Sequence, residues 1–419
     1  MSPGNIHADL LNGPHRLAKA RRKLRFLRCC GWLVFLVEVC TLAVCVVSYA
    51  EHHGRWFTYG WTLALVVAWF HGLPLLLGRI LARVKARVGP DGDRWRIGKY
   101  SEAELRAVIR TATAGLPALL RRTRVEISEI RCATAWTWLS FFRLDARQAK
   151  PIVLTSGSLH YLERDELMAV LLHEIGHHMP ENRPAVFGGW LLTHITLHAA
   201  AMAAYAYGGS SENLGIVVFI VLNFAAGAIS AWATQGLACP IEHLCDAFAA
   251  QRVGAAAMIN ALLKIAEDSE LTEVVLVWAA RELIYEKDID VDDLILAFAE
   301  SRPYGRIFHE NLIRHAAEVV KRLREGAKSR PGGKAKRRQE NPELKALVEK
   351  RRSRDFRRIR WRRFDRDNDG VLTAAEIACL CNALRSRPDD VLVTSIEEAE
   401  PTTHPPCRDR ILLLHEAFP

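Results

Sequence analysis

Residue types suited to metal-dependent hydrolysis occur together in the segment His173-Glu174-Ile175-Gly176-His177. On a helix, residues four apart lie on one face about one turn apart, so the two imidazoles could bind the same metal ion. The carboxylate of Glu174 would then reach the open coordination position and act as a base for a water molecule. Zinc prefers such nitrogen ligands. The segment therefore predicts a hydrolytic zinc site on a helix, completed by a third ligand from elsewhere in the chain.

Candidates for the third ligand lie in residues 240–250, which we predict to form a second helix. Glu242 and Asp246 are one helical turn apart in this segment. One carboxylate could bind zinc while the other accepts the free ring N–H of a histidine ligand. His243 and Cys245 are the rival ligands. The alternative without a metal is a solvated acidic helix face.

The residues around the motif indicate how its helix is positioned. Asp165 and Glu166 place the negative charges that a helix N-terminus favours, and Pro180 ends the pattern. Earlier in the chain, periodicity and β-branched content predict a helix over 101–120 and short strands over 125–130 and 152–155. We therefore expect a mixed α+β domain around the motif.

Four apolar segments are long enough to cross a bilayer as helices of about 20 residues. They cover residues 31–50, 57–77, 184–207 and 214–236. Lys and Arg are concentrated before the first segment and after the second, which places both flanks on the cytoplasmic side. The last two segments carry polar residues, so a re-entrant hairpin is the alternative for them. The predicted fold class is a predominantly α-helical integral membrane protein, with four transmembrane helices and a cytoplasmic α+β domain of the gluzincin type.

The distribution of charge indicates which partners the chain binds, and the cysteine content indicates the redox state of its thiols. The net charge is +10, and the basic residues lie beside the apolar segments and in one C-terminal stretch that includes a basic helix over 343–364. This distribution favours anionic lipid head groups over nucleic acid. The ten cysteines form no closely spaced framework, so we expect reduced thiols. The sequence thus predicts a lipid bilayer as a partner, argues against nucleic acid and leaves the oligomeric state open.

A second cation site is predicted by residues 365–376, whose spacing matches the calcium loop of an EF-hand. Gly370 occupies the sixth position, where the loop turns sharply. The predicted ligands are Asp365, Asp367, Asp369, Val371 through its carbonyl, Thr373 and Glu376. A comparable acidic run that begins at Asp288 lacks both the glycine and the final glutamate. We therefore expect calcium at a single, unpaired hand.

With these motifs in place, the chain resembles the HtpX-like membrane zinc metalloproteases, which are relatives of the CAAX prenyl proteases. The resemblance includes the two N-terminal apolar segments, the stretch 155–159, the His-Glu-x-x-His segment, and the pair Glu242 and Asp246. It reaches the C-terminal stretch 403–411, which looks like the family's His-Pro element with its following arginine.

The resemblance implies roles for individual residues. Zinc would be bound by His173, His177 and Glu242, with Asp246 as a hydrogen-bond partner of a ligand and Glu174 as the general base. His404 would donate to the developing oxyanion, and Arg410 would support His404 or the substrate.

Two departures from the family pattern affect the expected organisation. The chain has Ala133-Thr134-Ala135-Trp136 where the family usually carries an Asn-Ala-Phe-like motif before the strand that pairs with the substrate, and it has an insertion over about 326–400. The predicted order is a basic N-terminus (1–28), a transmembrane hairpin (29–80), the first protease part (81–183), a second membrane hairpin (184–237), the second protease part (238–325), a basic linker with the calcium loop (326–400) and the His-Pro element (401–419).

The function implied by the resemblance is a membrane-bound zinc endopeptidase that hydrolyses misfolded or membrane-associated proteins. Its expected place is a bacterial inner membrane, with the active site facing the cytoplasm. A processing protease for one defined peptide is the nearest alternative, and a non-catalytic, calcium-responsive membrane scaffold is another. Charged residues on both sides of the motif argue against a zinc site inside the bilayer.

Overall fold

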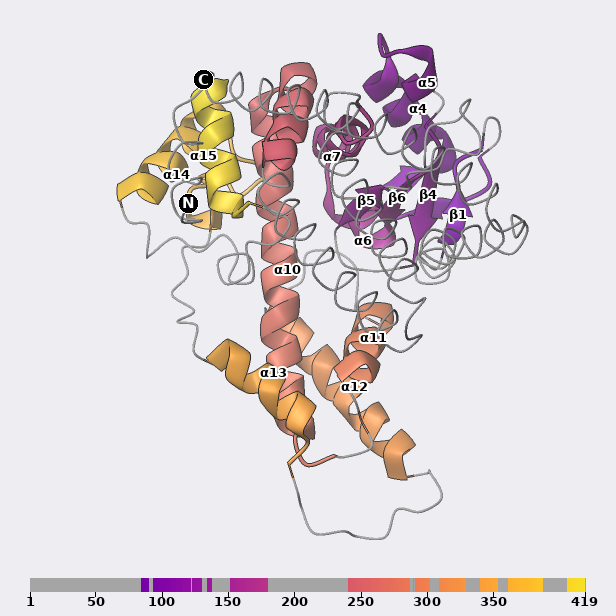
Figure 1. Cartoon of the computed structure of the whole chain (residues 1–419), viewed down its shortest axis with the longest axis vertical. Coiled ribbons are helices and arrows are strands. Elements are labelled where there is room, and N and C mark those ends of the chain that lie inside the picture. Colours follow the sequence, from indigo (N-terminus) through magenta and orange to yellow (C-terminus); the bar gives the residue numbers. More distant parts are fainter. Residues whose placement is uncertain are drawn as a thin grey trace, which may run out of the picture.

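The structure is a computed structural model, and Figure 1 shows its arrangement. It describes residues 84–89, 93–121, 123–129, 134–137, 151–179, 240–286, 289, 291–301, 309–328, 340–352, 361–386 and 405–418.

A four-stranded sheet lies at the start of the described part. Its strands are β1 (Val84–Arg87), β4 (Val125–Ser128), β6 (Ile152–Thr155) and β5 (Ala135–Thr137), in that spatial order. β4 and β6 are parallel, while β1 and β5 run antiparallel to their neighbours. The side chains of β6 are all buried, as expected for a β-branched central strand. The predicted strands near 125 and 152 are confirmed, and β5 forms one edge of the sheet.

Short elements join this sheet to the helix that carries the motif. The hairpin of β2 (Arg96–Ile97) and β3 (Tyr100–Ser101) leads into α4 (Glu102–Thr113), which a capping box between Ser101 and Glu104 begins. α5 (Ala118–Arg121) precedes β4, and α6 (Ser156–Tyr161) follows β6 directly. The predicted helix over 101–120 is thus two helices, because Gly115 adopts a positive φ of 73° between them.

The motif helix α7 (Arg164–Gly176) begins with a second capping box, in which the backbone N–H of Glu163 donates to Glu166 Oε2 at 2.7 Å. The predicted start at Asp165 and Glu166 is therefore confirmed. The helix ends earlier than Pro180, and His177 is its C-cap residue.

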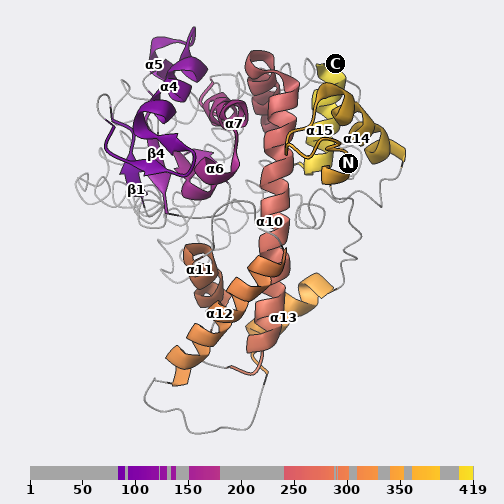
Figure 2. The same cartoon turned by 180° about the vertical axis from the view of Figure 1, so that it is seen from behind.

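A long helix, α10 (Ala255–Leu283), runs through the middle of the molecule (Figures 1 and 2). The sheet and α7 lie on one side of it. On the other side lie α14 (Ala374–Ser386) and α15 (Cys407–Ala417), and the 3-10 turn η2 (Trp361–Arg363) precedes α14 in the chain. The helices α11 (Val291–Ser301), α12 (His309–Lys328) and α13 (Pro342–Arg352) pack around its C-terminal end.

Separate hydrophobic clusters hold these layers together. Leu105, Ile127, Leu154 and Leu171 belong to the cluster that joins the sheet, α4 and α7. A second cluster joins the other face of α7 to α10, α14 and α15, and it contains Leu172, Ile259, Leu372, Ile377 and Ile411. α7 is consequently apolar on both faces and is fixed between the sheet and α10.

The prediction of an integral membrane protein with four transmembrane helices is wrong on this structure. Within the described ranges, no helix is both long and apolar enough to cross a bilayer. α10 has 29 residues, but Lys264, Glu267 and Asp268 interrupt its middle. The four predicted spans lie outside the described residues. The described part is helical with a few strands, and the predicted location in a bacterial inner membrane is corrected together with the spans on which it depended.

Candidate active site

The side chains of His173, His177 and Glu242 converge between α7 and a helical segment over residues 240–253. The Nε2 atoms of the two histidines lie 3.2 Å apart. Glu242 places Oε2 at 3.3 Å from His173 Nε2 and Oε1 at 3.3 Å from His177 Nε2. The predicted metal-binding side chains therefore meet, although about seventy residues separate them in sequence.

The chemistry of these donors fits a zinc ion. Two imidazole nitrogens and a carboxylate are a ligand set that zinc accepts, and a catalytic site leaves one further position open. Asp246 Oδ1 lies 2.8 Å from His173 Nδ1, so Nδ1 donates to this carboxylate and Nε2 is the ring nitrogen that faces Glu242 and His177. Burial lowers the pKa of His173, but hydrogen bonds to Asp246 and Glu242 outweigh it and raise the pKa to about 10. The cluster is therefore a strong site for positive charge.

Arg410 on α15 binds the carboxylate of Asp246 through two hydrogen bonds. Its Nε donates to Asp246 Oδ2 at 2.7 Å, and its Nη2 donates to Asp246 Oδ1 at 2.6 Å. Asp246 is fully buried and Arg410 is 8 % exposed. Burial disfavours the charge of Asp246, yet Arg410 and His173 hold its pKa below the ordinary value. This bidentate pair connects α15 to His173, a predicted metal ligand, through one carboxylate.

Glu174 follows the first histidine on α7 and is 7 % exposed. Burial raises its pKa to about 7, while the nearby charge of His173 acts in the opposite direction. A carboxyl group with such a pKa exchanges its proton readily near neutral pH, as a general base must.

Gly176 explains how the two helices come so close. A Cβ at this position would lie 3.1 Å from the Cα, Cβ and Sγ atoms of Cys245. The absence of a side chain at 176 lets residue 245 pack closely against α7 without such a tight contact. Cys245 is fully buried in this contact, and neither it nor His243 belongs to the converging group. The packing thus presents Glu242, one turn earlier, to the histidines.

The family model for peptidase family M48 matches residues 142–417. The chain belongs to peptidase family M48. No match to the chain was found among curated proteins or among solved structures. The match extends from before β6 to the end of α15, so it covers both helices of the cluster and Arg410. An M48 peptidase is a metalloprotease, and its substrates are polypeptides.

Sequence reasoning missed how the edge strand β5 is anchored to β6 and α6. Thr155 and Ser158 both donate hydroxyl hydrogen bonds to the carbonyl of Thr134, at 2.8 and 2.7 Å. The backbone N–H of Thr134 donates in turn to Thr155 Oγ1 at 3.1 Å. These bonds fix the residue that precedes β5. Two hydroxyl residues three apart, at the end of a buried strand and in the helix that follows, were the available signal.

Two further predicted residues of the site are His404 and Arg410. His404 lies outside the described residues. Arg410 contacts Asp246, and its Nη2 lies 3.7 Å from Glu242 Oε2. Two buried carboxylates, here Glu242 and Asp246, need a nearby cation. This need could have indicated from the sequence that Arg410 pairs with them.

A second acidic group converges in the predicted calcium loop, where oxygens of Asp365, Asp367 and Glu376 lie within 4.8 Å of one another. Asp365 Oδ2 accepts from the backbone N–H of Gly370 at 2.9 Å. Its Oδ1 is buried and has no hydrogen-bond partner. The carboxylate of Asp369 instead accepts from the N–H of Val371 at 2.7 Å.

The hydroxyl of Thr373, another predicted ligand of this loop, donates to Glu376 Oε2 at 2.8 Å. Asn368 and Gly370 adopt positive φ angles of 59° and 86°, which give the loop its tight turn. Arg362, expected to belong to a lipid-binding basic surface, instead binds Glu267 on α10 through Nε and Nη2, both at 2.9 Å.

Proposed function

We propose that the chain is a zinc-dependent endopeptidase in which His173, His177 and Glu242 hold the metal. The observation that carries the proposal is the approach of two Nε2 atoms and one carboxylate to within 3.3 Å of one another. Two imidazole nitrogens and a carboxylate at such distances can all direct a lone pair at one metal cation. When bound, zinc supplies Lewis acidity that lowers the pKa of a water molecule and polarises a peptide carbonyl.

The residues around the metal site have separate tasks. Glu174 takes a proton from the attacking water and returns it to the leaving amine nitrogen. Asp246 fixes the tautomer of His173. Arg410 is a positioning residue that acts through Asp246, and His404 is the proposed donor to the oxyanion, on the strength of the His-Pro resemblance.

We propose unfolded or misfolded polypeptides as the substrates, as in protein quality control. The position of β5 at the edge of the sheet supports this proposal. Among the strands of the described residues, β5 pairs with β6 alone, and it also contacts α7. An extended peptide could add to such an edge through main-chain hydrogen bonds, which are the same for every sequence. Maturation of one defined peptide is the competing function. It would yield a single cleavage in one substrate rather than many fragments from an unfolded protein.

We also propose calcium for residues 365–376. The three converging carboxylates and the buried, unpartnered Asp365 Oδ1 support a cation at this loop. An all-oxygen group is typical of calcium rather than zinc.

The zinc proposal is tested with purified Glu174→Gln and Glu242→Ala variants, by metal analysis and by hydrolysis of unfolded casein. Glu174→Gln should keep stoichiometric zinc and lose about 10² to 10⁴ in rate, because only the base is removed. Glu242→Ala should lose zinc as well as activity. Glu318→Gln, on an exposed position of α12, is the matched control. Near-normal hydrolysis by Glu174→Gln would contradict the mechanism, and full zinc in Glu242→Ala would contradict the ligand set.

A further inference from the structure

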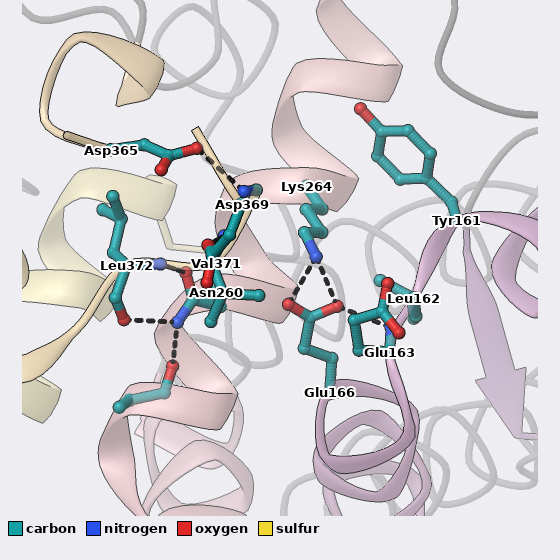
Figure 3. Close-up of polar contacts among 12 residues, drawn as sticks. Tyr161, Leu162, Glu163, Glu166, Asn260, Lys264, Asp365, Asp369, Val371 and Leu372 are labelled. Carbon is teal, nitrogen blue, oxygen red and sulfur yellow. Dashed lines mark hydrogen bonds and ion pairs between the residues drawn. The ribbon is translucent and has the colours of Figure 1, made fainter. Parts of the chain in front are cut away.

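The backbone of Leu372, the eighth residue of the calcium loop, is bonded to a side chain of α10. Its N–H donates to Asn260 Oδ1 at 2.8 Å, and its carbonyl accepts from Asn260 Nδ2 at 2.9 Å (Figure 3). Asn260 Nδ2 also donates to the carbonyl of Ala256 at 3.0 Å, which fixes the orientation of the amide. Leu372 and Asn260 are each 1 % exposed. The amide therefore satisfies both backbone groups of a buried loop residue.

In a pair of calcium loops, the second loop would supply hydrogen-bond partners for this backbone, and here the Asn260 side chain supplies them. A buried backbone N–H and C=O need partners, and a neighbouring extended strand is their usual source. The one other acidic run of this kind that we found in the sequence, from Asp288, lacks the glycine and the last glutamate of a calcium loop. A primary amide presents one acceptor and one donor side by side, as a peptide group of a paired strand does. The single hand is thus paired with the peptidase domain itself.

The same face of α10 holds the start of the catalytic helix. Lys264 lies one turn after Asn260, and its Nζ binds Glu166 Oε1 at 2.6 Å and Oε2 at 2.8 Å (Figure 3). Both side chains are buried. Glu166 also accepts the N–H of Glu163 in the capping box, and it precedes His173 by two helical turns. Lys264 therefore sets the position of α7 at its N-terminus.

Glu267, two turns after Asn260, also joins the residues that precede the calcium loop to the residues that precede α7. It accepts from Arg362 and from Trp361 Nε1 at 3.2 Å, both just before the loop. It also accepts from Tyr161 Oη at 3.0 Å, three residues before α7 begins. A stripe of α10 residues, Asn260, Lys264 and Glu267, thus contacts the calcium loop and the catalytic helix at once.

We propose that Asn260 takes the place of a second hand, so that calcium in the loop is coupled through α10 to the position of α7. The inference rests on the proposed calcium site. A cation that joins Asp365, Asp367 and Glu376 fixes the loop backbone and with it the Leu372 groups that Asn260 holds. Since coupling between sites is reciprocal, loss of the Asn260 bonds must also weaken calcium binding.

The first test is calorimetric titration of CaCl₂ into the full chain and two variants. Asn260→Ala should bind calcium at least about tenfold more weakly than the unaltered chain, since the loop loses two bonds that favour its bound form. Asn382→Ala, at an exposed position of α14, should bind as the unaltered chain does. If the unaltered chain takes up no calcium, the calcium site itself is wrong. If all three proteins bind equally, the site stands but the role of Asn260 is wrong.

The second test measures hydrogen exchange of residues 164–170 and hydrolysis of casein, with calcium or with a calcium-selective chelator. In the unaltered chain, calcium should slow exchange at the start of α7 and raise the rate at least about twofold. Asn260→Ala should lose both responses. Asn260→Asp, which keeps the acceptor for the Leu372 N–H but lacks the donor, serves if the alanine variant does not fold. Unchanged exchange in the unaltered chain would overturn the coupling. Hydrogen exchange tests the coupling even if the chain has no peptidase activity.

Discussion

The cluster around His173 draws its side chains from α7, from the helical segment over 240–253 and from α15, whereas the cluster around Asp365 forms within twelve consecutive residues. The first depends on how helices pack, and its outermost member is the buried Arg410. The second depends on turn geometry, namely the positive φ angles of Asn368 and Gly370. Substitutions far from the converging side chains should therefore damage the proposed zinc site more than the proposed calcium loop.

The largest effect is expected when Arg410 is removed. Arg410→Ala leaves Asp246 buried without its cation, and breaking a buried pair in this way costs about 3 to 5 kcal/mol. The matched control is Arg385→Ala, which removes the 3.0 Å pair with Glu416 between α14 and α15. That pair is partly exposed, so its loss should cost about 1 kcal/mol or less. Urea unfolding of each protein provides the comparison.

Arg410→Lys sharpens this prediction. Lysine keeps the charge but cannot form the bidentate contact, so it should recover only part of the lost stability. It should also leave zinc affinity reduced by about 10- to 100-fold, because His173 is no longer fixed through Asp246. Equal losses of stability for Arg410→Ala and Arg385→Ala would mean that the buried pair contributes no more than a surface one.

A smaller effect is expected from Gly176→Ala. The added methyl group would meet Cys245 at 3.1 Å and push the segment over 240–253 away from α7. Overpacking of this kind costs about 1 to 3 kcal/mol, and it should weaken zinc binding because Glu242 moves with the segment. Gly326→Ala in α12 is the control, since a Cβ there meets nothing within 4 Å. It should stabilise the protein by about 0.5 to 1 kcal/mol.

Thermal unfolding with and without added zinc measures both glycine variants. Zinc stabilisation that is unaltered in Gly176→Ala would show that Cys245 yields without moving Glu242. The close approach at Gly176 would then be a packing detail rather than a condition for the metal site.

The sequence predicted those parts of the site that follow from local periodicity. Residues four apart on a helix share a face, so His173 and His177 could be paired from spacing alone, and the loop over 365–376 follows a fixed pattern. The strand at 152–155 followed from its β-branched residues. These are features that neighbouring residues determine among themselves.

Contacts between distant segments could not be predicted in the same way. Spacing left Glu242, Asp246, His243 and Cys245 as rivals, because which face of a helix meets α7 depends on packing at Gly176. The bonds from Asn260 to Leu372 join residues 112 apart, and no local pattern indicates them. Apolar length also misled the fold class, since within the described residues no helix combines length with the apolar character that a span requires.

The smallest effect is expected within the calcium loop, from Asp369→Asn. Asp369 is exposed, and an asparagine oxygen can still accept the 2.7 Å bond from the N–H of Val371, so the loop should keep its shape. Calcium affinity should fall by about tenfold or less, because the site loses one negative charge but no part of its framework. Asp365→Asn is the comparison. Its side chain is buried, holds Gly370 through Oδ2 and has an Oδ1 without a hydrogen-bond partner, so affinity should fall much further. Calorimetry on both variants separates the two contributions. Equal losses would mean that total charge, rather than the position of each carboxylate, sets the calcium affinity of this loop. The loop would then differ from the packing-dependent zinc cluster in its electrostatics rather than in its geometry.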